Sequence, residues 1–249
     1  MDLTSGALSF ARYAFPPNEL GYCGPDGASL LLEHATSGAE HPEIIRRARE
    51  FDGAWPYLET IAAACGIDDP LDARVVEAYW VGSDLLERVD PEVFLTTLAA
   101  KFAGQVGGVW DRVSASAGPL AHHSFHVFAV YPWFGLLGGG SDVPLSVLES
   151  CRIRWGTVMA IDGEHAVVRS QPLSWDGSVL SLGAEREESV RWSDRGRSLQ
   201  ARLETGDQVS LHWDWVCERL SEDQVNELAR CSARQLDVVN AHNRASVRG

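Results

Sequence analysis

Apolar residues recur at helical spacing through the first half of the chain. In the segment that begins at Pro42, Ile44, Ile45 and Ala48 share one helix face, and proline is favoured in the first turn of a helix. The segment from Trp55 to Cys65 is followed by Gly66, and glycine is typical of helix C-termini. The predicted helices span residues 28–34, 42–51, 55–65, 70–79 and 90–102. This pattern predicts a mostly α-helical domain over residues 1–140.

The pattern changes after Gly138-Gly139-Gly140-Ser141-Asp142, which reads as a linker because glycine and small polar residues favour loops. From Arg152 to His212, alternating and β-branched residues dominate. The predicted strands span residues 157–161, 166–169, 178–182, 189–192 and 209–213. Asp162-Gly163 is a two-residue hairpin turn between the first two. Five short strands suggest a small β-barrel, because closure removes exposed strand edges.

The last segment is predicted to be helical. Ser221 and Gln224 have the spacing of a capping box, in which each side chain bonds the other residue's backbone N–H. The apolar stripe that follows consists of Val225, Leu228, Ala229, Leu236 and Val239. We therefore expect an α+β fold, with a helical domain at 1–140 and a small OB-like barrel plus a C-terminal helix at 150–243.

Charge and cysteine usage narrow the functional classes. The 249-residue chain has a formal net charge of −14 and no basic stripe, which argues against nucleic-acid binding. Its longest apolar run, 125–137, contains His126 and Pro132 and is too short to span a membrane. Five cysteines with no Cys-x-x-Cys pair indicate free thiols and a reducing cytoplasm.

Cys151 and His212 are the first candidate site. We expect Cys151 to open the first strand of the barrel and His212 to end the last one. A thiolate and an imidazole can together hold a soft transition metal. The alternative is that both residues only pack in the core, as most buried cysteines do.

Cys23 is a candidate catalytic nucleophile. If Pro25 begins a helix, the Cys23 thiol lies just before a helix N-terminus, whose positive dipole end lowers a thiol pKa. Such a thiolate suits nucleophilic catalysis or metal binding. The alternative is an unreactive cysteine in a turn.

Three histidines, His122, His123 and His126, lie within five residues. On a helix, His122 and His126 would share a face with the i, i+4 spacing of zinc-binding motifs. On a strand, His122 and His126 would share a face with Ser124 instead. A Zn²⁺ or Fe²⁺ site with Cys23 as fourth ligand is one hypothesis, and ordinary packing is the other.

The second half resembles the HypC/HupF family of hydrogenase maturation chaperones. The resemblance covers roughly residues 150–240, and it rests on the order of several short motifs. They are Cys151, Gly156, Asp162-Gly163, Ala166-Val167-Val168, Gly206-Asp207-Gln208-Val209-Ser210-Leu211-His212 and Ser221-Glu222-Asp223-Gln224. The resemblance implies a small barrel with a C-terminal helix. It also implies that Cys151 and His212 hold an iron unit of the Fe(CN)2CO type and contact the hydrogenase large subunit.

The first half is similar to an uncharacterised actinobacterial family associated with hydrogenase genes. The similar segments are 10–18, 21–25 and 122–128. We therefore expect a cytoplasmic, non-enzymatic maturation protein of nickel-iron hydrogenase, with the large subunit or other maturation proteins as partners. One alternative is an enzyme that uses Cys23, His122, His123 and His126, with the barrel as a docking module. Another is an interaction protein without metal.

Overall fold

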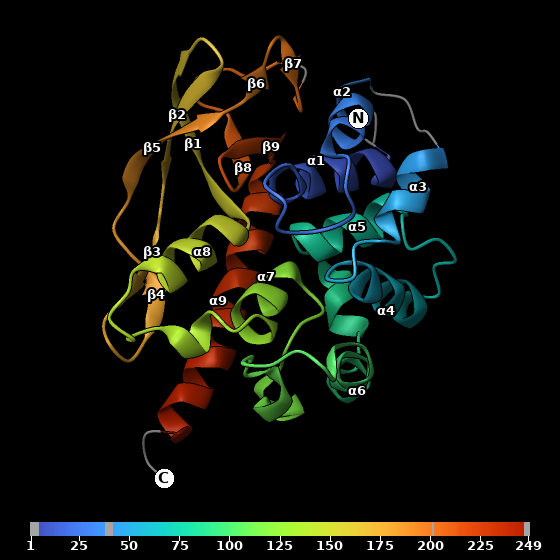
Figure 1. Ribbon diagram of the computed structural model, residues 1–249, viewed down its shortest axis with the longest axis vertical. Helices are drawn as coiled ribbons and strands as arrows, with labels where there is room; N and C mark the ends of the chain where they lie inside the picture. Colours follow the sequence, from blue (N-terminus) through green and yellow to red (C-terminus); the bar gives the residue numbers. More distant parts are fainter. Residues whose placement is uncertain (1–4, 38–41, 201, 247–249) are drawn as a thin grey trace.

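The computed structural model describes residues 5–37, 42–200 and 202–246. Helices make up the N-terminal part, a sheet-rich region follows, and one long helix ends the chain, so the α+β class is confirmed. In Figure 1 the helices of the N-terminal part lie to one side and below, and the strands gather on the other side.

Helix α1 (Gly6–Glu19) was not predicted, although it lies at the centre of the molecule. Almost all of its residues from Gly6 to Asn18 are buried, so no polar face marks it as amphipathic. Pro16 and Pro17 also occupy its last turn, where proline normally signals a helix end. Ser5 caps the first turn by accepting from the backbone N–H of Leu8.

The five helices predicted from the sequence pattern are present. They are α2 (Ala28–Ser37), α3 (Pro42–Ala48), α4 (Trp55–Cys65), α5 (Ala73–Trp80) and α6 (Pro91–Phe102). Gly66 ends α4 in the left-handed conformation, as expected. Helix α5 begins later than residue 70 because the side chain of Asp72 accepts from the N–H of Arg74 and caps it there.

Two short helices follow in the middle of the chain. Helix α7 (His123–Phe125) runs into a π-helical turn (His126–Val130), and α8 (Val143–Cys151) begins directly after the glycine-rich loop. Helix α8 was not predicted. Consequently, Cys151 does not open a strand but ends a helix, and the first strand begins three residues later.

The main sheet contains five strands. They are β1 (Arg154–Asp162), β2 (His165–Ser170), β5 (Arg186–Arg191), β8 (Gln208–His212) and β9 (Trp215–Arg219). Their order is β1-β2-β5-β9-β8, and β8 pairs again with β1, so the sheet closes on itself. The link between β5 and β9 is a single parallel pair, Arg191 with Trp215.

Two shorter ladders lie outside this sheet. Strands β3 (Leu173–Trp175) and β4 (Leu180–Leu182) form one hairpin, and β6 (Ser193–Asp194) pairs with β7 (Arg197–Ser198). The predicted strand at 178–182 therefore does not belong to the main sheet. The fifth strand of the main sheet is instead β9. It was not predicted because it follows His212 so closely that the sequence does not separate it from β8.

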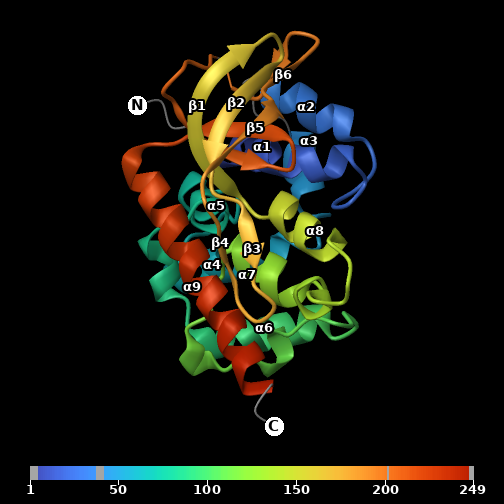
Figure 2. The same cartoon turned by 90° about the vertical axis from the view of Figure 1, so that its left-hand side faces the viewer.

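Helix α9 (Glu222–Ser246) ends the chain with the expected capping box. The N–H of Ser221 donates to Gln224 Oε1 at 2.9 Å, and the N–H of Gln224 donates to Ser221 Oγ at 3.2 Å. Figure 2 shows α9 running down the lower part of the molecule beside the β3–β4 hairpin. Among the described residues, no helix is long and apolar enough to cross a membrane.

The buried apolar residues form two clusters. The larger cluster joins both halves of the chain and includes Phe10 from α1, Tyr57 from α4, Trp215 from β9 and Leu228 from α9. The smaller cluster fills the inside of the main sheet, with Val158, Val168 and Leu211 among its members. The N-terminal helices and the sheet region are therefore packed around one shared core.

Candidate functional site

Cys151, His123 and His212 form a compact group of metal-ligand side chains. One possible ligand atom from each residue lies within 4.8 Å of those from the other two, and all three side chains are buried. The expected pair of Cys151 and His212 is thus brought together, and His123 joins it. The three residues come from α8, β8 and α7, so only the folded chain assembles them.

His212 ends β8 and is fixed in one orientation. Its Nδ1 lies 2.6 Å from the carbonyl oxygen of Tyr13 in α1, so Nδ1 carries the proton and donates it. The other nitrogen, Nε2, is buried and has no hydrogen-bond partner. A ring held by Nδ1–H to a backbone carbonyl, with a free lone pair on Nε2, is the usual arrangement of a metal-binding histidine.

His123 is held by contacts at both ring nitrogens. Its Nε2 lies 2.9 Å from the carbonyl oxygen of Cys151 and therefore donates, which leaves the lone pair on Nδ1. The hydroxyl of Tyr79 lies 3.1 Å from that Nδ1 and 3.4 Å from the carbonyl oxygen of Gly53. Tyr79 therefore has a second acceptor available if His123 Nδ1 binds a metal instead.

The Cys151 thiol is almost completely buried at the end of α8. Burial raises the pKa of this thiol far above its usual range, with a smaller contribution from Cys23. Burial likewise lowers the pKa of His123 to about 4 and that of His212 well below 6.5. Near neutral pH the group therefore consists of one protonated thiol and two neutral imidazoles.

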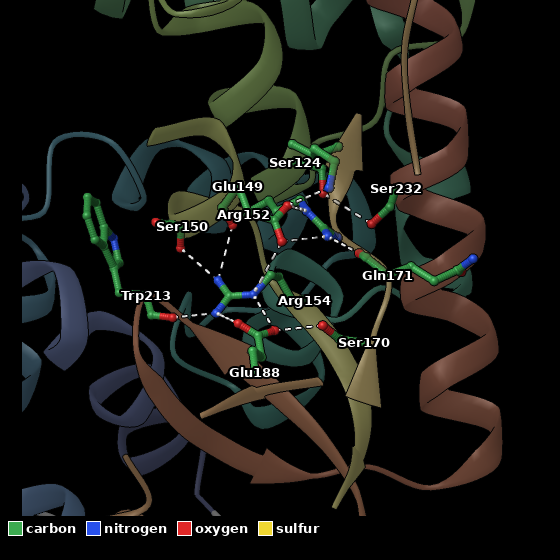
Figure 3. Close-up of polar contacts among 11 residues, drawn as sticks. Ser124, Glu149, Ser150, Arg152, Arg154, Ser170, Gln171, Glu188, Trp213 and Ser232 are labelled. Atoms are coloured by element: carbon green, nitrogen blue, oxygen red, sulfur yellow. Dashed lines mark hydrogen bonds and ion pairs between the residues drawn. The ribbon is translucent and has the colours of Figure 1, made fainter. Parts of the chain in front are cut away.

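A buried arginine ties together the two segments that carry the thiol and the second imidazole (Figure 3). Arg154 Nη2 donates to the carbonyl oxygen of Trp213 at 2.6 Å, and Nη1 donates to that of Glu149 at 3.1 Å. Its Nη2 also pairs with Glu188 at 3.1 Å. The backbone adds a direct link, from the N–H of Trp213 to the carbonyl oxygen of Ser150 at 2.8 Å.

The group lies in the wall of a cavity of about 250 Å³ where the N-terminal helices meet the sheet region. Its lining is mainly aromatic and apolar, and the described residues that form it include no Asp, Glu, Lys or Arg. Tyr22 and Trp213 also line the cavity and stack with ring centroids 4.4 Å apart and planes inclined by 12°. Because Tyr22 is 62% exposed, this stacked pair lies between the cavity and solvent.

Cys23 lines the same cavity, but its local structure differs from the expectation. Helix α2 begins at Ala28 rather than at Pro25, so Cys23 lies in a loop, away from the helix N-terminus. Burial, followed by the nearby Asp52, raises the pKa of the Cys23 thiol to about 11. The expected start of a helix at Pro25, on which the activation of this cysteine depended, is therefore wrong.

His122 and His126 do not share a face as predicted. The side chain of His122 caps α7 by accepting from the N–H of Ser124 at 3.1 Å, and it is not part of the cavity lining. Instead, His123 and His126, three residues apart, line the cavity. His122 is the N-cap of α7 and has extended backbone, so its side chain does not follow the helical register of His123 and His126.

Two residues that support the site were not among the expected site residues. Tyr13 supplies the backbone carbonyl that orients His212. The centroid of the Trp80 ring lies 4.6 Å from that of His123 and 5.8 Å from that of His212. Neither role has a local sequence signal. Any residue can supply a backbone carbonyl, and an aromatic residue in a helix is normally interpreted as part of the hydrophobic core.

Thiolate and imidazole donors in an uncharged, mostly apolar cavity suit zinc, copper(I) or iron better than magnesium or calcium, which prefer oxygen ligands. Comparison with known proteins found no matching curated protein and no matching solved structure. A family model described as a family of unknown function, DUF6390, matches residues 2–246. The chain therefore belongs to the DUF6390 family.

Proposed function

We propose that this protein is a cytoplasmic accessory protein of nickel-iron hydrogenase maturation, which holds an iron unit of the Fe(CN)2CO type for the large subunit. The observation that carries the proposal is the group of Cys151, His123 and His212, whose ligand atoms lie within 4.8 Å of one another. The free Nε2 of His212 adds to it, because a buried nitrogen without a partner is costly unless a ligand satisfies it.

The sheet region supports the link to hydrogenase maturation. Its closed five-stranded sheet, its Asp162-Gly163 turn and its C-terminal helix resemble those of the HypC/HupF family. His212 ends a strand, as the family's histidine does. Cys151 reaches the same place from the end of α8, whereas the family's cysteine begins the chain.

Each of the three ligand residues would have its own part in binding the iron unit. Cys151 would lose its proton on binding and supply a soft, strongly donating thiolate, and His212 would supply the Nε2 lone pair. The cargo itself brings the iron and its diatomic ligands. His123 would keep its Nε2–H on the Cys151 carbonyl and could bind through Nδ1 once Tyr79 turns its hydroxyl to the carbonyl oxygen of Gly53. The apolar walls exclude water.

The alternative of a thiol-dependent enzyme has less support. Such an enzyme needs a thiolate at Cys23, and the raised pKa of Cys23 keeps that thiol protonated near neutral pH. Among the described residues that line the cavity there is no carboxylate or lysine to act as a general base, and the lowered pKa values of His123 and His126 make these two lining histidines weak bases. We therefore assign Cys23 to the cavity wall rather than to catalysis.

Infrared spectroscopy of protein purified without oxygen, from cells that make nickel-iron hydrogenase, tests the proposal. We expect iron together with cyanide and carbonyl stretching bands in the wild-type protein, and loss of both in Cys151→Ala and His212→Ala. Cys231→Ala is the matched control, because Cys231 is fully buried but lies outside the cavity lining. Equal bands in wild type and Cys151→Ala would contradict the assignment of Cys151.

A further inference from the structure

Trp80, the last residue of α5, lies beside two of the three candidate ligands. Its ring centroid is 4.6 Å from that of His123 and 5.8 Å from that of His212, so the indole packs against both imidazoles. The side chain is 3% exposed and lines the cavity. The ring also stacks on Tyr13, with centroids 5.3 Å apart and planes inclined by 14°, and this contact helps to hold it in place.

The indole N–H of Trp80 is buried and has no acceptor among the described residues. An indole nitrogen can only donate, and a buried donor without an acceptor is costly. The lone pair of His212 Nε2 is also buried without a partner, although the two rings are in contact. A donor and an acceptor on neighbouring rings therefore remain unpaired with each other. A ligand that binds His212 through a metal and accepts a hydrogen bond at another atom would satisfy both.

An unpartnered indole N–H is not by itself a binding site, as Trp175 shows. The Nε1 of Trp175 is likewise buried and lacks a partner in the part of the chain that the structure describes. Trp175, however, is in β3 and is not part of the cavity lining. What distinguishes Trp80 is its contact with two imidazoles of the ligand group. The position of the donor, together with its lack of a partner, therefore points to a ligand bound by that group.

The proposed cargo presents an acceptor of matching chemistry. An iron(II) ion with two cyanides and the Cys151 thiolate carries one net negative charge, and the described residues that line the cavity include no lysine or arginine to balance it. Neutral N–H dipoles must then stabilise that charge, and they are most effective where water is excluded. The nitrogen of a metal-bound cyanide carries an anionic lone pair, and hydrogen bonds to charged acceptors are the stronger ones. The carbonyl oxygen of the same unit is nearly neutral and accepts much more weakly.

We propose that Trp80 recognises a cyanide of the iron unit by donating a hydrogen bond from its indole N–H to the cyanide nitrogen. This inference rests on the proposed function, because it requires the cargo to be bound by Cys151, His123 and His212. It adds the residue that distinguishes cyanide from carbonyl in the cavity. Trp80 does not bind the metal and acts only on a diatomic ligand of the cargo.

Infrared spectra of the full-length protein, purified without oxygen and carrying the cargo, test this role. Trp80→Phe keeps an aromatic ring and removes the N–H. We expect this variant to shift one cyanide band to lower wavenumber, because a hydrogen bond to the nitrogen of metal-bound cyanide raises its stretching frequency. The carbonyl band should move less. Trp175→Phe makes the same change at an unpartnered indole outside the lining and should leave every band in place.

Two further measurements make the test independent of how Trp80→Phe folds. Benzothienylalanine in place of Trp80 keeps the size of the indole but has sulfur instead of the N–H, so we expect the same cyanide shift as in Trp80→Phe. Titration of the metal-free protein with Co²⁺, followed by visible absorption, should give equal affinity in the wild type and in this isosteric variant, because Trp80 is not a metal ligand.

The outcomes separate the role of Trp80 from the proposed function. Cyanide bands at the wild-type position in both variants would overturn the hydrogen bond while leaving the binding of the iron unit intact. A Co²⁺ affinity that falls in the isosteric variant would mean that Trp80 supports the metal ligands instead of the cyanide, which also overturns it. Absence of iron and of the cyanide and carbonyl bands from the wild type would overturn the proposed function and this inference together.

Discussion

Arg154 donates from Nη2 to the carbonyl oxygen of Trp213, 2.6 Å away, and so joins the end of α8 to the turn between β8 and β9. Cys151 ends that helix, and His212 is the residue before that turn. The arginine contacts neither candidate ligand, yet it holds the backbone segments that carry both (Figure 3). The separation of thiol and imidazole therefore depends on this buried ion-pair network as well as on the backbone link from Trp213 to Ser150.

Replacing Arg154 should weaken both the fold and the site. Arg154→Met leaves Glu188 largely buried without its cation and removes the bond to Trp213. Breaking a buried ion pair on one side costs on the order of 3 kcal/mol, so we expect a loss of that size in the free energy of unfolding. Urea denaturation measures it. We also expect weaker Co²⁺ binding at temperatures where the variant remains folded.

Arg169→Met is the matched control for that variant. Arg169 pairs with Glu187 at 3.0 Å across neighbouring strands, but both side chains are about half exposed. Exposed pairs contribute less than about 1 kcal/mol, so stability and Co²⁺ affinity should change little. If Arg154→Met kept wild-type Co²⁺ affinity, the positioning role of Arg154 would be wrong.

The buried histidines should make the metal-free protein sensitive to acid. Burial lowers the pKa values of His122 and His126 to about 3 and that of His123 to about 4, and it lowers that of His212 as well. In the unfolded chain these rings take up protons near pH 6.5, while the folded protein does not. Stability is therefore fully present above pH 6.5 and declines as the pH falls toward 4. His123 alone contributes a loss of about 3 kcal/mol over this range.

Urea denaturation at a series of pH values measures this decline. His126→Phe should reduce the slope between pH 6.5 and 4, because one fewer proton is then taken up on unfolding. The exposed His165 serves as a control, and His165→Gln should leave the slope as in the wild type. A stability that stays constant between pH 6.5 and 4 would contradict the buried, neutral state of the four rings.

Local patterns were sufficient for much of the fold but not for its centre. Helix α4 and its Gly66 cap were predicted correctly because an apolar stripe and a capping glycine are both local sequence signals. Helix α1 was missed because nearly all its residues are buried, which leaves no polar face. Strand β9 was missed because Trp213 adopts the left-handed conformation, with φ of 53°, in a turn that no Gly or Asn marks.

The candidate site, like the fold, was predicted only in part from local sequence patterns. The pairing of Cys151 with His212 was expected, but the contribution of His123 depends on long-range contacts of its ring with the Cys151 carbonyl and with His212, which spacing along the chain does not encode. The predicted pair of His122 and His126 was wrong because His122 is the N-cap of α7 with extended backbone, so that His123 and His126 line the cavity instead.

Metal binding should release one proton near neutral pH. The pKa of the Cys151 thiol is raised by burial, so this thiol is protonated before metal binds, whereas the buried imidazoles are already neutral. A bound metal requires the thiolate, so we expect a proton-to-metal ratio of about one. The apparent Co²⁺ affinity should then rise about tenfold per pH unit between pH 6.5 and 8.5.

Calorimetry in buffers of different ionisation enthalpy gives that proton ratio. Cys151→Ala should abolish the proton release along with tight binding, while Cys231→Ala should preserve both. A ratio near two would indicate that Cys23 also binds the metal as a thiolate. A ratio near zero in the wild type would mean that no thiolate is a ligand.

The stacked pair of Tyr22 and Trp213 should control access to the cavity. An aromatic pair contributes about 0.5–1.5 kcal/mol, so its loss shifts the balance toward an open cavity by between about two- and tenfold. Tyr22→Ala should therefore speed alkylation of Cys151 by N-ethylmaleimide by a similar factor, measured on the Cys151 peptide by mass spectrometry. Leu136→Ala removes an exposed apolar side chain outside the lining and should leave the rate unchanged. An unchanged rate in Tyr22→Ala would mean that Cys151 is reached by another route, because the stack would then not lie on the path from solvent.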